Sequence, residues 1–171
     1  MKIWTVGHSN LPVAAFLREL EGSGIQLVVD IRTVPKSRHN PQFEGEALSA
    51  SLAEAGLAYG RLPELGGFRR PQQDSPNGAW RNESFRGYAD YMQTPAFEAG
   101  LEQLLEWAAA KCTAIMCAEA VPWRCHRSLV ADALTARGHE VLDILGAGPA
   151  KPHRMTPFAV VAGTRITYPH P

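Results

Sequence analysis

Short apolar runs alternate along the chain with segments of helical periodicity. Five short segments are predicted as strands: residues 2–6, 25–31, 57–62, 113–116 and 140–145. Residues 25–31 are nearly continuous in apolar residues, as expected for a strand buried on both faces of a sheet. Between the predicted strands apolar residues recur on one helix face, for example at Val13, Phe16, Leu17 and Leu20. This alternation predicts an α/β fold, a three-layer sandwich with helices on both faces of a mostly parallel sheet of about five strands.

The ends of the helices are marked by capping residues and by breakers. Ser9 and Asn10, followed by Pro12, predict the start of the first helix, and Gly22 and Gly24 predict its end. Thr94 and Pro95 predict the start of another helix in the same way. The remaining helices are expected over residues 44–55, 83–92 and 125–137.

We expect one α/β domain over residues 1–171, because this length suits a single hydrophobic core. Two segments fall outside the regular alternation. Residues 63–82 form a long connection that contains Phe68 and Trp80, and we interpret it as an ordered, lid-like loop. Residues 146–171 form a proline-rich C-terminal tail, in which residues 159–162 and 165–168 are expected to pair as a hairpin.

Composition narrows the class of protein. The chain has no run of about 18 apolar residues, so no membrane span is expected. The sequence MKIWTVGHSN lacks the apolar stretch of a signal peptide, and three cysteines are an odd number for a disulfide framework. These features predict a cytoplasmic protein without a bond between Cys117 and Cys125.

The net charge of zero hides an uneven distribution of charge. The segments 32–43, 60–86, 117–127 and 146–157 hold 12 basic and 4 acidic residues, whereas the rest of the chain is acidic. These segments are the connections that leave the predicted strands. Most of the basic residues of the chain are arginines, which bind phosphate and carboxylate groups in a bidentate fashion. We therefore expect an anion-binding edge of the sheet.

The richest chemistry lies in the sequence CAEAVPWRCH, residues 117–126, between a predicted strand and a predicted helix. Ligands of α/β proteins bind at such turns, outside the carboxyl ends of the strands. Side chains that follow other strands should meet this turn at the same edge. The predicted catalytic residues are Glu119, His126, Asp30, His8 and Cys125, and the predicted substrate- or anion-binding residues are Arg32, Arg124, Arg127, Ser9, Glu64 and Arg81.

The chain also resembles a known family. Its segments TVGHSN, VVDIRTVPKSRHNPQF, LPELGG, WRNESFRGYADYM and MCAEAVPWRCHRSLVADAL look like those of the family filed as domain of unknown function number 488, in the expected order and over nearly the whole chain. The resemblance implies a cytoplasmic α/β domain of bacteria or archaea without an assigned activity. It supports the polar positions above as the working ones without naming a reaction.

Two other kinds of site share features with the same turn. The order strand, cysteine, loop, arginine, helix resembles cysteine phosphatases and sulfurtransferases, but six residues instead of five separate Cys117 from Arg124, and the loop lacks glycine. Cys117, Cys125 and His126, with His8, His39 or Glu119, could supply zinc ligands, but their spacing is not a common zinc pattern. The sequence therefore requires no metal or other cofactor.

The hypothesis favoured by the sequence is an enzyme that acts on a small anionic or phosphate-bearing substrate, such as a nucleotide or a nucleic-acid end. Glu119 or Asp30 is its base, and His126 or His8 its acid. The alternatives are a cysteine-dependent phosphatase or sulfurtransferase, and a non-catalytic module that binds single-stranded nucleic acid through arginines and the aromatic residues Trp80, Phe85 and Trp123.

Overall fold

The computed structural model describes residues 1–171 and contains a mixed sheet with the strand order β3-β2-β4-β1-β5-β6. The first five strands are parallel, and β6 runs antiparallel to β5 at the edge. The α/β fold and the mostly parallel sheet are thus confirmed. The strands are β1 (Lys2–Gly7), β2 (Leu27–Asp30), β3 (Ala58–Arg61), β4 (Thr113–Cys117), β5 (Glu140–Asp143) and β6 (Lys151–Pro152).

The sheet has six strands, one more than the sequence predicts. The additional strand, β6, has only two residues, and both Lys151 and Pro152 are exposed. Such a short edge pairing needs no apolar side chains, so it leaves no hydrophobic pattern that could be recognised in the sequence.

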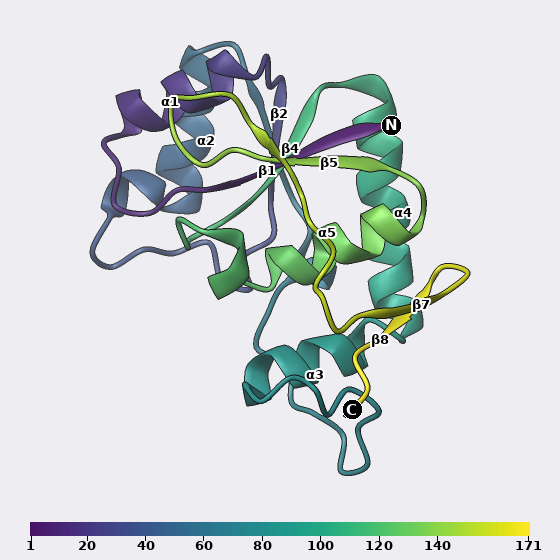
Figure 1. Ribbon diagram of the computed structural model, residues 1–171. Coiled ribbons are helices and arrows are strands. Elements are labelled where there is room, and N and C mark those ends of the chain that lie inside the picture. The colour runs from purple at the N-terminus through teal and green to yellow at the C-terminus, as the bar shows by residue number, and fades with distance from the viewer.

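Helices cover both faces of the sheet, as predicted (Figure 1). The helices α1 (Val13–Gly22) and α2 (Gly45–Glu54) pack on one face, where Phe16 and Leu48 join a core with Val28 of β2. The helices α3 (Glu83–Tyr91), α4 (Pro95–Ala110) and α5 (Arg127–Ala136) belong to the core of the other face. None of the helices is both long and apolar enough to span a membrane.

Two predicted helix starts are wrong. Helix α1 begins at Val13 after Pro12, and neither Ser9 nor Asn10 caps it. Ser9 instead takes a left-handed backbone conformation (φ 50°) while its N–H donates to the carbonyl of Ala118, so it turns the chain away from β1. Helix α5 begins at Arg127, because a 3₁₀ turn over Pro122–Arg124 precedes Cys125 in extended conformation.

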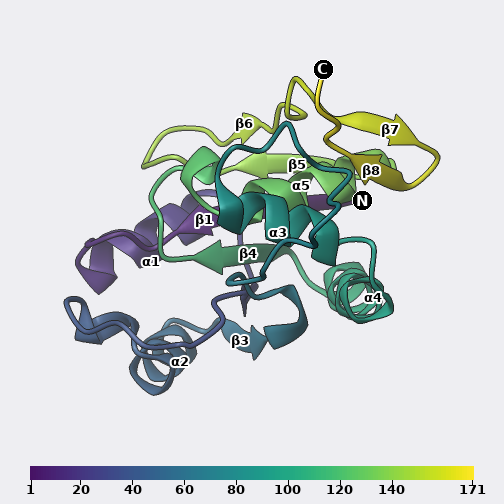
Figure 2. The ribbon, with the colours of Figure 1, turned by 90° about the horizontal axis from the view of Figure 1, so that it is seen from below.

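The long loop and the C-terminal tail lie side by side (Figures 1 and 2). The backbone N–H of Ala79 donates to Tyr168, and the N–H of Tyr168 donates to the side chain of Asn77. Asp90 of α3 accepts three hydrogen bonds from the same loop, including one of 2.6 Å from Ser75. The loop is therefore fixed to the body of the protein, and the tail is fixed to the loop.

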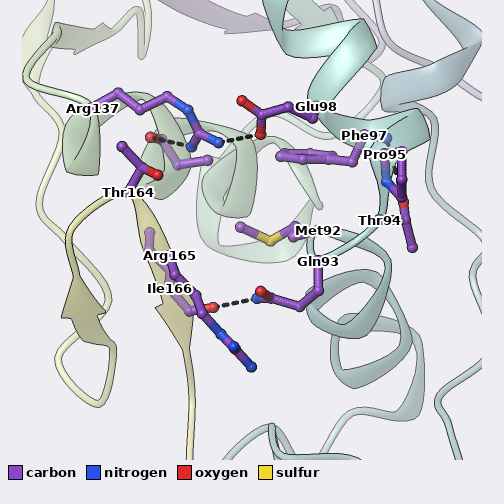
Figure 3. A pocket seen from close by; sticks show the side chains of 11 residues that line it. Met92, Gln93, Thr94, Pro95, Phe97, Glu98, Arg137, Thr164, Arg165 and Ile166 are labelled. Atoms are coloured by element: carbon purple, nitrogen blue, oxygen red, sulfur yellow. Dashed lines mark hydrogen bonds and ion pairs between the residues drawn. The ribbon is translucent and has the colours of Figure 1, made fainter.

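The predicted hairpin of the tail is confirmed as β7 (Val160–Ala162) and β8 (Arg165–Thr167). It is held against the helices by a 2.6 Å hydrogen bond from Gln93 Nε2 to the carbonyl of Ile166 (Figure 3). A cavity of about 330 Å³ lies between the hairpin and the helices, and Arg137 and Glu98, which form an ion pair, contribute to its lining. None of the predicted site residues lines this cavity.

Candidate functional site

A cavity of about 550 Å³ opens at the carboxyl ends of β2 and β4. These strands are neighbours in the sheet, with Asp30 opposite Met116, so the segments that follow them meet at one edge. Helix α3 and the long loop close the other sides. The lining combines cationic, thiol and aromatic groups: Arg32, Lys36, Phe68, Phe85, Tyr88, Cys117, Glu119, Arg124, Cys125 and His126, with Thr33, Val34, Gly67, Asn82, Ser84 and Ala118.

The loop after β4 approaches the end of β1 very closely. A Cβ atom on Gly7 would lie 1.6 Å from the carbonyl oxygen of Glu119 and 2.6 Å from Nη1 of Arg127. Only glycine allows this approach. The backbone N–H groups of His8 and Ser9 donate to Cys117 and Ala118 and continue the pairing beyond the strand. The residues after Cys117 are therefore placed by the end of β1.

Arg127 is fully buried, and its guanidinium group is hydrogen-bonded to this loop. Its Nη1 donates to Cys117 Sγ (3.1 Å) and to the carbonyl of Glu119 (2.7 Å), while Nη2 donates to Ala120 (3.3 Å) and Nε to Thr5 Oγ1 (3.2 Å). The side chain does not line the cavity. Direct contact between Arg127 and a substrate anion, which the sequence predicts, does not fit this position, because the guanidinium is already engaged on all its nitrogens.

Arg127 lowers the pKa of the Cys117 thiol, to which it donates a hydrogen bond. Burial raises the pKa of Cys117, but a hydrogen bond from Cys125 and the charge and hydrogen bond of Arg127 outweigh burial and lower the pKa to about 7. The neighbouring Cys125 behaves in the opposite way, because burial and the nearby Cys117 raise its pKa well above the ordinary value. Of the two thiols, Cys117 is therefore the one that ionises more readily. All three cysteines are free thiols.

His126 has a defined tautomer at the wall of the cavity. Its Nε2 lies 3.0 Å from the carbonyl of Ile31, which can only accept, so Nε2 carries the proton. The unprotonated Nδ1 faces Cys125 Sγ at 3.5 Å. Burial lowers the pKa of His126 to about 4, although the backbone carbonyl groups of Ile31 and Leu65 oppose the change. The ring is therefore neutral at pH 7 and is poorly suited to the role of general acid.

The carboxylate of Asp30 lies beneath the cavity and not in its lining. It accepts hydrogen bonds from the backbone N–H, Nε and Nη2 of Arg32, at 3.0, 2.9 and 2.7 Å, and from the hydroxyl of Tyr59 at 2.6 Å. Burial and the Asp30 carboxylate raise the pKa of Tyr59, which keeps this hydroxyl a donor. The structure thus brings Asp30 and Arg32 together as a pair that stabilises the edge, and leaves Asp30 without a free oxygen for base catalysis.

His8 is also buried behind the cavity. Its ring stacks on Phe43 with centroids 4.3 Å apart, Nδ1 donates to the carbonyl of Ser9 (2.7 Å), and Nε2 lies 3.4 Å from Arg32 Nη1. Burial lowers the pKa of His8, and the charge of Arg32 adds to this effect. His8 therefore supports Arg32 and does not face the space where a substrate would bind.

The predicted single cleft with His8, Asp30, Arg32, Glu64, Glu119 and Arg127 is only partly formed, since Arg32 and Glu119 alone line the cavity. Glu64 and Arg81 are exposed and lie outside the lining, and the half-buried Ser9 also lies outside it. Glu64 is displaced because its 3₁₀ turn after β3 packs against α4, so that Gly100 lies close to it. Cys125, His126 and Arg124 lie in the lining, together with Glu119.

Cys117 lines the cavity and was not predicted as a site residue, and the same is true of Lys36, Phe68, Tyr88, Asn82 and Ser84. Phe68 is 86% exposed and has a left-handed backbone conformation (φ 58°), which is strained for a residue with a bulky side chain. The pair of glycines before it was the available signal, because a Cβ atom on Gly66 would lie 3.0 Å from Thr33 and one on Gly67 3.1 Å from His126, so the backbone passes close to the wall of the cavity there.

No group of three or more histidine, cysteine or acidic side chains is arranged to hold a metal ion, and this includes Cys117, Cys125 and His126. The sulfur of Cys117 is turned toward Arg127, and the Nε2 of His126 toward a carbonyl. What the cavity offers instead is the Cys117 thiol with its lowered pKa, one carboxylate in the lining, and exposed cationic side chains at Lys36 and Arg124.

The family model "Domain of unknown function DUF488" matches residues 12–134, which contain the lining of the cavity. The chain belongs to this family. No curated protein and no solved structure matches the chain. The resemblance of the sequence segments to this family is thereby confirmed, and the family itself carries no assigned reaction.

Proposed function

We propose that this member of the DUF488 family is an enzyme that uses the thiolate of Cys117 as a nucleophile on a phosphate-bearing substrate. One observation carries the proposal: the fully buried Arg127 donates to Cys117 Sγ at 3.1 Å and, with Cys125, lowers the pKa of Cys117 to about 7. Thiolates, and not thiols, are nucleophiles, and reactive cysteines are recognised by such electropositive surroundings.

The cationic groups at the cavity favour an anionic substrate. Arg124 and Lys36 are exposed in its lining, where no other side chain is hydrogen-bonded to them, while the charge of Arg32 is balanced by Asp30. Guanidinium groups bind phosphate oxygens in a bidentate fashion. The exposed ring of Phe68 offers a stacking surface beside them, which suits a nucleotide or a nucleic-acid end.

In the proposed reaction the sulfur of Cys117 attacks phosphorus, so an S–P bond forms while the P–O bond to the leaving group breaks. The leaving oxygen keeps the electron pair and takes a proton from the acid form of Glu119, the carboxyl group that lines the cavity. Water then attacks phosphorus and gives its proton to Glu119, the S–P bond breaks, and inorganic phosphate leaves. The thiolate is regenerated, so the cycle needs no oxidant or reductant.

Acid/base catalysis without a covalent intermediate has less support. It requires a base and an acid in the cavity, but Asp30 and His8 are engaged behind it and His126 is neutral with a hydrogen-bonded Nε2. Glu119 would have to serve alone. The nucleophile hypothesis uses the same Glu119 and gives the thiolate a function.

The test is a search for the covalent intermediate. The protein is mixed with an aryl phosphate or a nucleoside monophosphate, quenched rapidly with denaturant, and digested for mass spectrometry. We expect a burst of leaving alcohol equal to the enzyme concentration and a phosphoryl group on the peptide that contains Cys117. Turnover without a burst and without modification of Cys117 would exclude the nucleophile.

Two exposed aromatic residues favour a second candidate, a module that binds single-stranded nucleic acid. Phe68 is 86% and Trp123 is 64% exposed, and Arg124 follows Trp123 directly. Such a module would bind oligonucleotides less tightly at high salt, would not depend on Glu119, and would convert no substrate. Titration of the protein and of Glu119→Gln at two salt concentrations, together with an activity screen, separates the two candidates.

Replacing Arg124 by alanine is expected to raise KM for a phosphate-bearing substrate about fivefold with kcat nearly unchanged, because an exposed arginine contributes about 1 kcal/mol to holding an anion. Steady-state kinetics measures this change. Arg165→Ala is the matched control, since Arg165 is also exposed but lies in the hairpin of the tail, and it should leave KM unaltered. An equal fall in kcat would assign Arg124 a role in the reaction step itself.

A further inference from the structure

A continuous path of buried polar groups leads from Cys117 to the C-terminal tail. It begins with Arg127, whose Nε donates to Thr5 Oγ1 at 3.2 Å on the side away from the thiolate. The hydroxyl of Thr5 in turn donates to Asp143 Oδ1 at 2.6 Å. Thr5 and Asp143 are paired neighbours on β1 and β5, and α5 packs against β5, so the path crosses the sheet where these three elements lie side by side (Figures 1 and 2).

The path continues into the tail through His153. Its Nδ1 lies 3.4 Å from Asp143 Oδ2, and its Nε2 lies 2.8 Å from Asp132 Oδ1 of α5. The hydroxyl of Tyr168 donates to the other oxygen of Asp132 at 2.8 Å. The side chain of His153 is only 6% exposed, so it joins two almost fully buried carboxylates.

His153 is a cation in this position. Burial lowers its pKa, but the hydrogen bonds and charges of Asp132 and Asp143 outweigh burial and raise the pKa to about 9. A buried carboxylate without a cation takes up a proton more readily or attracts the nearest other cation. Two other cations lie near Asp143: Lys151 is its paired neighbour on β6, and Arg127 is linked to it through Thr5.

The hydroxyl of Thr5 fixes the direction in which hydrogen bonds are donated along the path, from Arg127 to Thr5 and from Thr5 to Asp143. It has one proton, which it gives to Asp143, and it therefore presents a lone pair to Nε of Arg127. If Asp143 lost its cation and became protonated, it would donate to Thr5 instead. The hydroxyl proton would then have to turn away from Asp143, and where it turns toward Nε the contact with Arg127 is weakened.

We propose that His153 is a positioning residue for the nucleophile, which acts through Asp143 and Thr5 to hold Arg127 against the thiolate of Cys117. The inference rests on the proposed function, in which this thiolate reacts. His153 and Tyr168 lie beyond residue 134, where the match to the family model ends. The tail therefore packs on α5 and, through His153, also influences the ionisation of Cys117 at the other end of the path.

The test measures the ionisation of Cys117 directly, by the ultraviolet absorbance of the thiolate as a function of pH, with Cys117→Ser as the blank. In His153→Gln the cation is removed while the size is nearly kept. We expect the pKa of Cys117 to rise, so that about fivefold less thiolate is present at pH 7. Thr5→Val, which removes the hydroxyl in the middle of the path without changing any charge, should have an effect of the same sign.

Three controls separate positioning from a general loss of structure. Thr5→Ser keeps the hydroxyl and His153→Arg keeps a cation, so both should retain the titration of the parent protein. His170→Gln changes an exposed histidine of the same tail and should also have no effect. If His153→Gln does not fold, Thr5→Val decides the question from within β1.

The outcomes differ for the two proposals. A parent protein in which Cys117 does not ionise near pH 7 overturns the proposed function, and this inference with it. A parent protein with the expected thiolate, whose titration is unchanged in folded His153→Gln and Thr5→Val, overturns this inference alone.

Discussion

Cys117→Ser is expected to lower kcat by at least about 10³-fold toward a phosphate-bearing substrate, with KM little changed. Serine has the same shape, but its hydroxyl does not ionise near neutral pH, so the contact with Arg127 no longer produces a nucleophile. The measurement is steady-state turnover of the best substrate from a screen of aryl phosphates and nucleotides.

The other two cysteines provide matched controls for this variant. Cys112 lies away from the cavity at the start of β4, and burial raises its pKa, so Cys112→Ser should retain full activity. Cys125→Ser keeps a hydrogen-bond donor beside Cys117 and should retain most of the activity. If Cys117→Ser is active while Glu119→Gln is inactive, the carboxylate is the essential group, and the acid/base mechanism replaces the covalent one.

Arg127→Met is expected to lower the free energy of unfolding by about 3–5 kcal/mol, the second large effect. Methionine fills much of the volume but leaves the partly buried carbonyl groups of Glu119 and Ala120 without their donor, and the buried hydroxyl of Thr5 loses a partner. Urea denaturation of the parent protein and the variant measures the difference.

Arg137→Met is the control for this comparison, because Arg137 follows the same helix but pairs with Glu98, whose side chain is 48% exposed. Arg137→Met should lower the free energy of unfolding by no more than about 1 kcal/mol. A similar cost for both variants would mean that the contacts of Arg127 contribute little to stability.

Arg127→Met should also change the pH dependence of the reaction. The pKa of Cys117 is about 7 in the parent protein, and the thiolate is present above this value and protonated below it. Removal of the guanidinium leaves burial as the larger influence, which raises the pKa of the thiol. The acidic limb of the profile of kcat/KM against pH should therefore move to higher pH in the variant.

The fold could be predicted from local patterns because burial on both faces of a sheet requires continuous apolar runs. Val28 and Val29 face opposite cores, and both are fully buried, so neither position could be polar. The hairpin of the tail was found from Gly163 between two short apolar segments. Strand β6 was missed because an exposed two-residue pairing depends only on the backbone.

The predicted site residues that are close in the sequence lie together. Glu119, Arg124, Cys125 and His126 share one turn and line the cavity, as does Cys117, which was not among the predicted site residues. The prediction was less successful for residues at the ends of other strands, because position at the edge does not determine whether a side chain faces the cavity or the core. Both Asp30 and His8 face the interior. Asp30 is hydrogen-bonded to Arg32 there, and His8 stacks on Phe43.

The sequence by itself determined the α/β class, the parallel edge and the turn that contains the thiols, because these depend on hydrophobic periodicity and on neighbours along the chain. Only the tertiary structure decided the burial, the hydrogen-bond partners and the ionisation of the polar side chains at the site. Arg127 became a buried partner of Cys117 because Gly7 lets the loop close over it. The link from Thr5 to Asp143 spans 138 positions and forms because β1 and β5 pair in one register. Hydrogen bonds and pKa values depend on such distant contacts and on burial, which no local pattern contains.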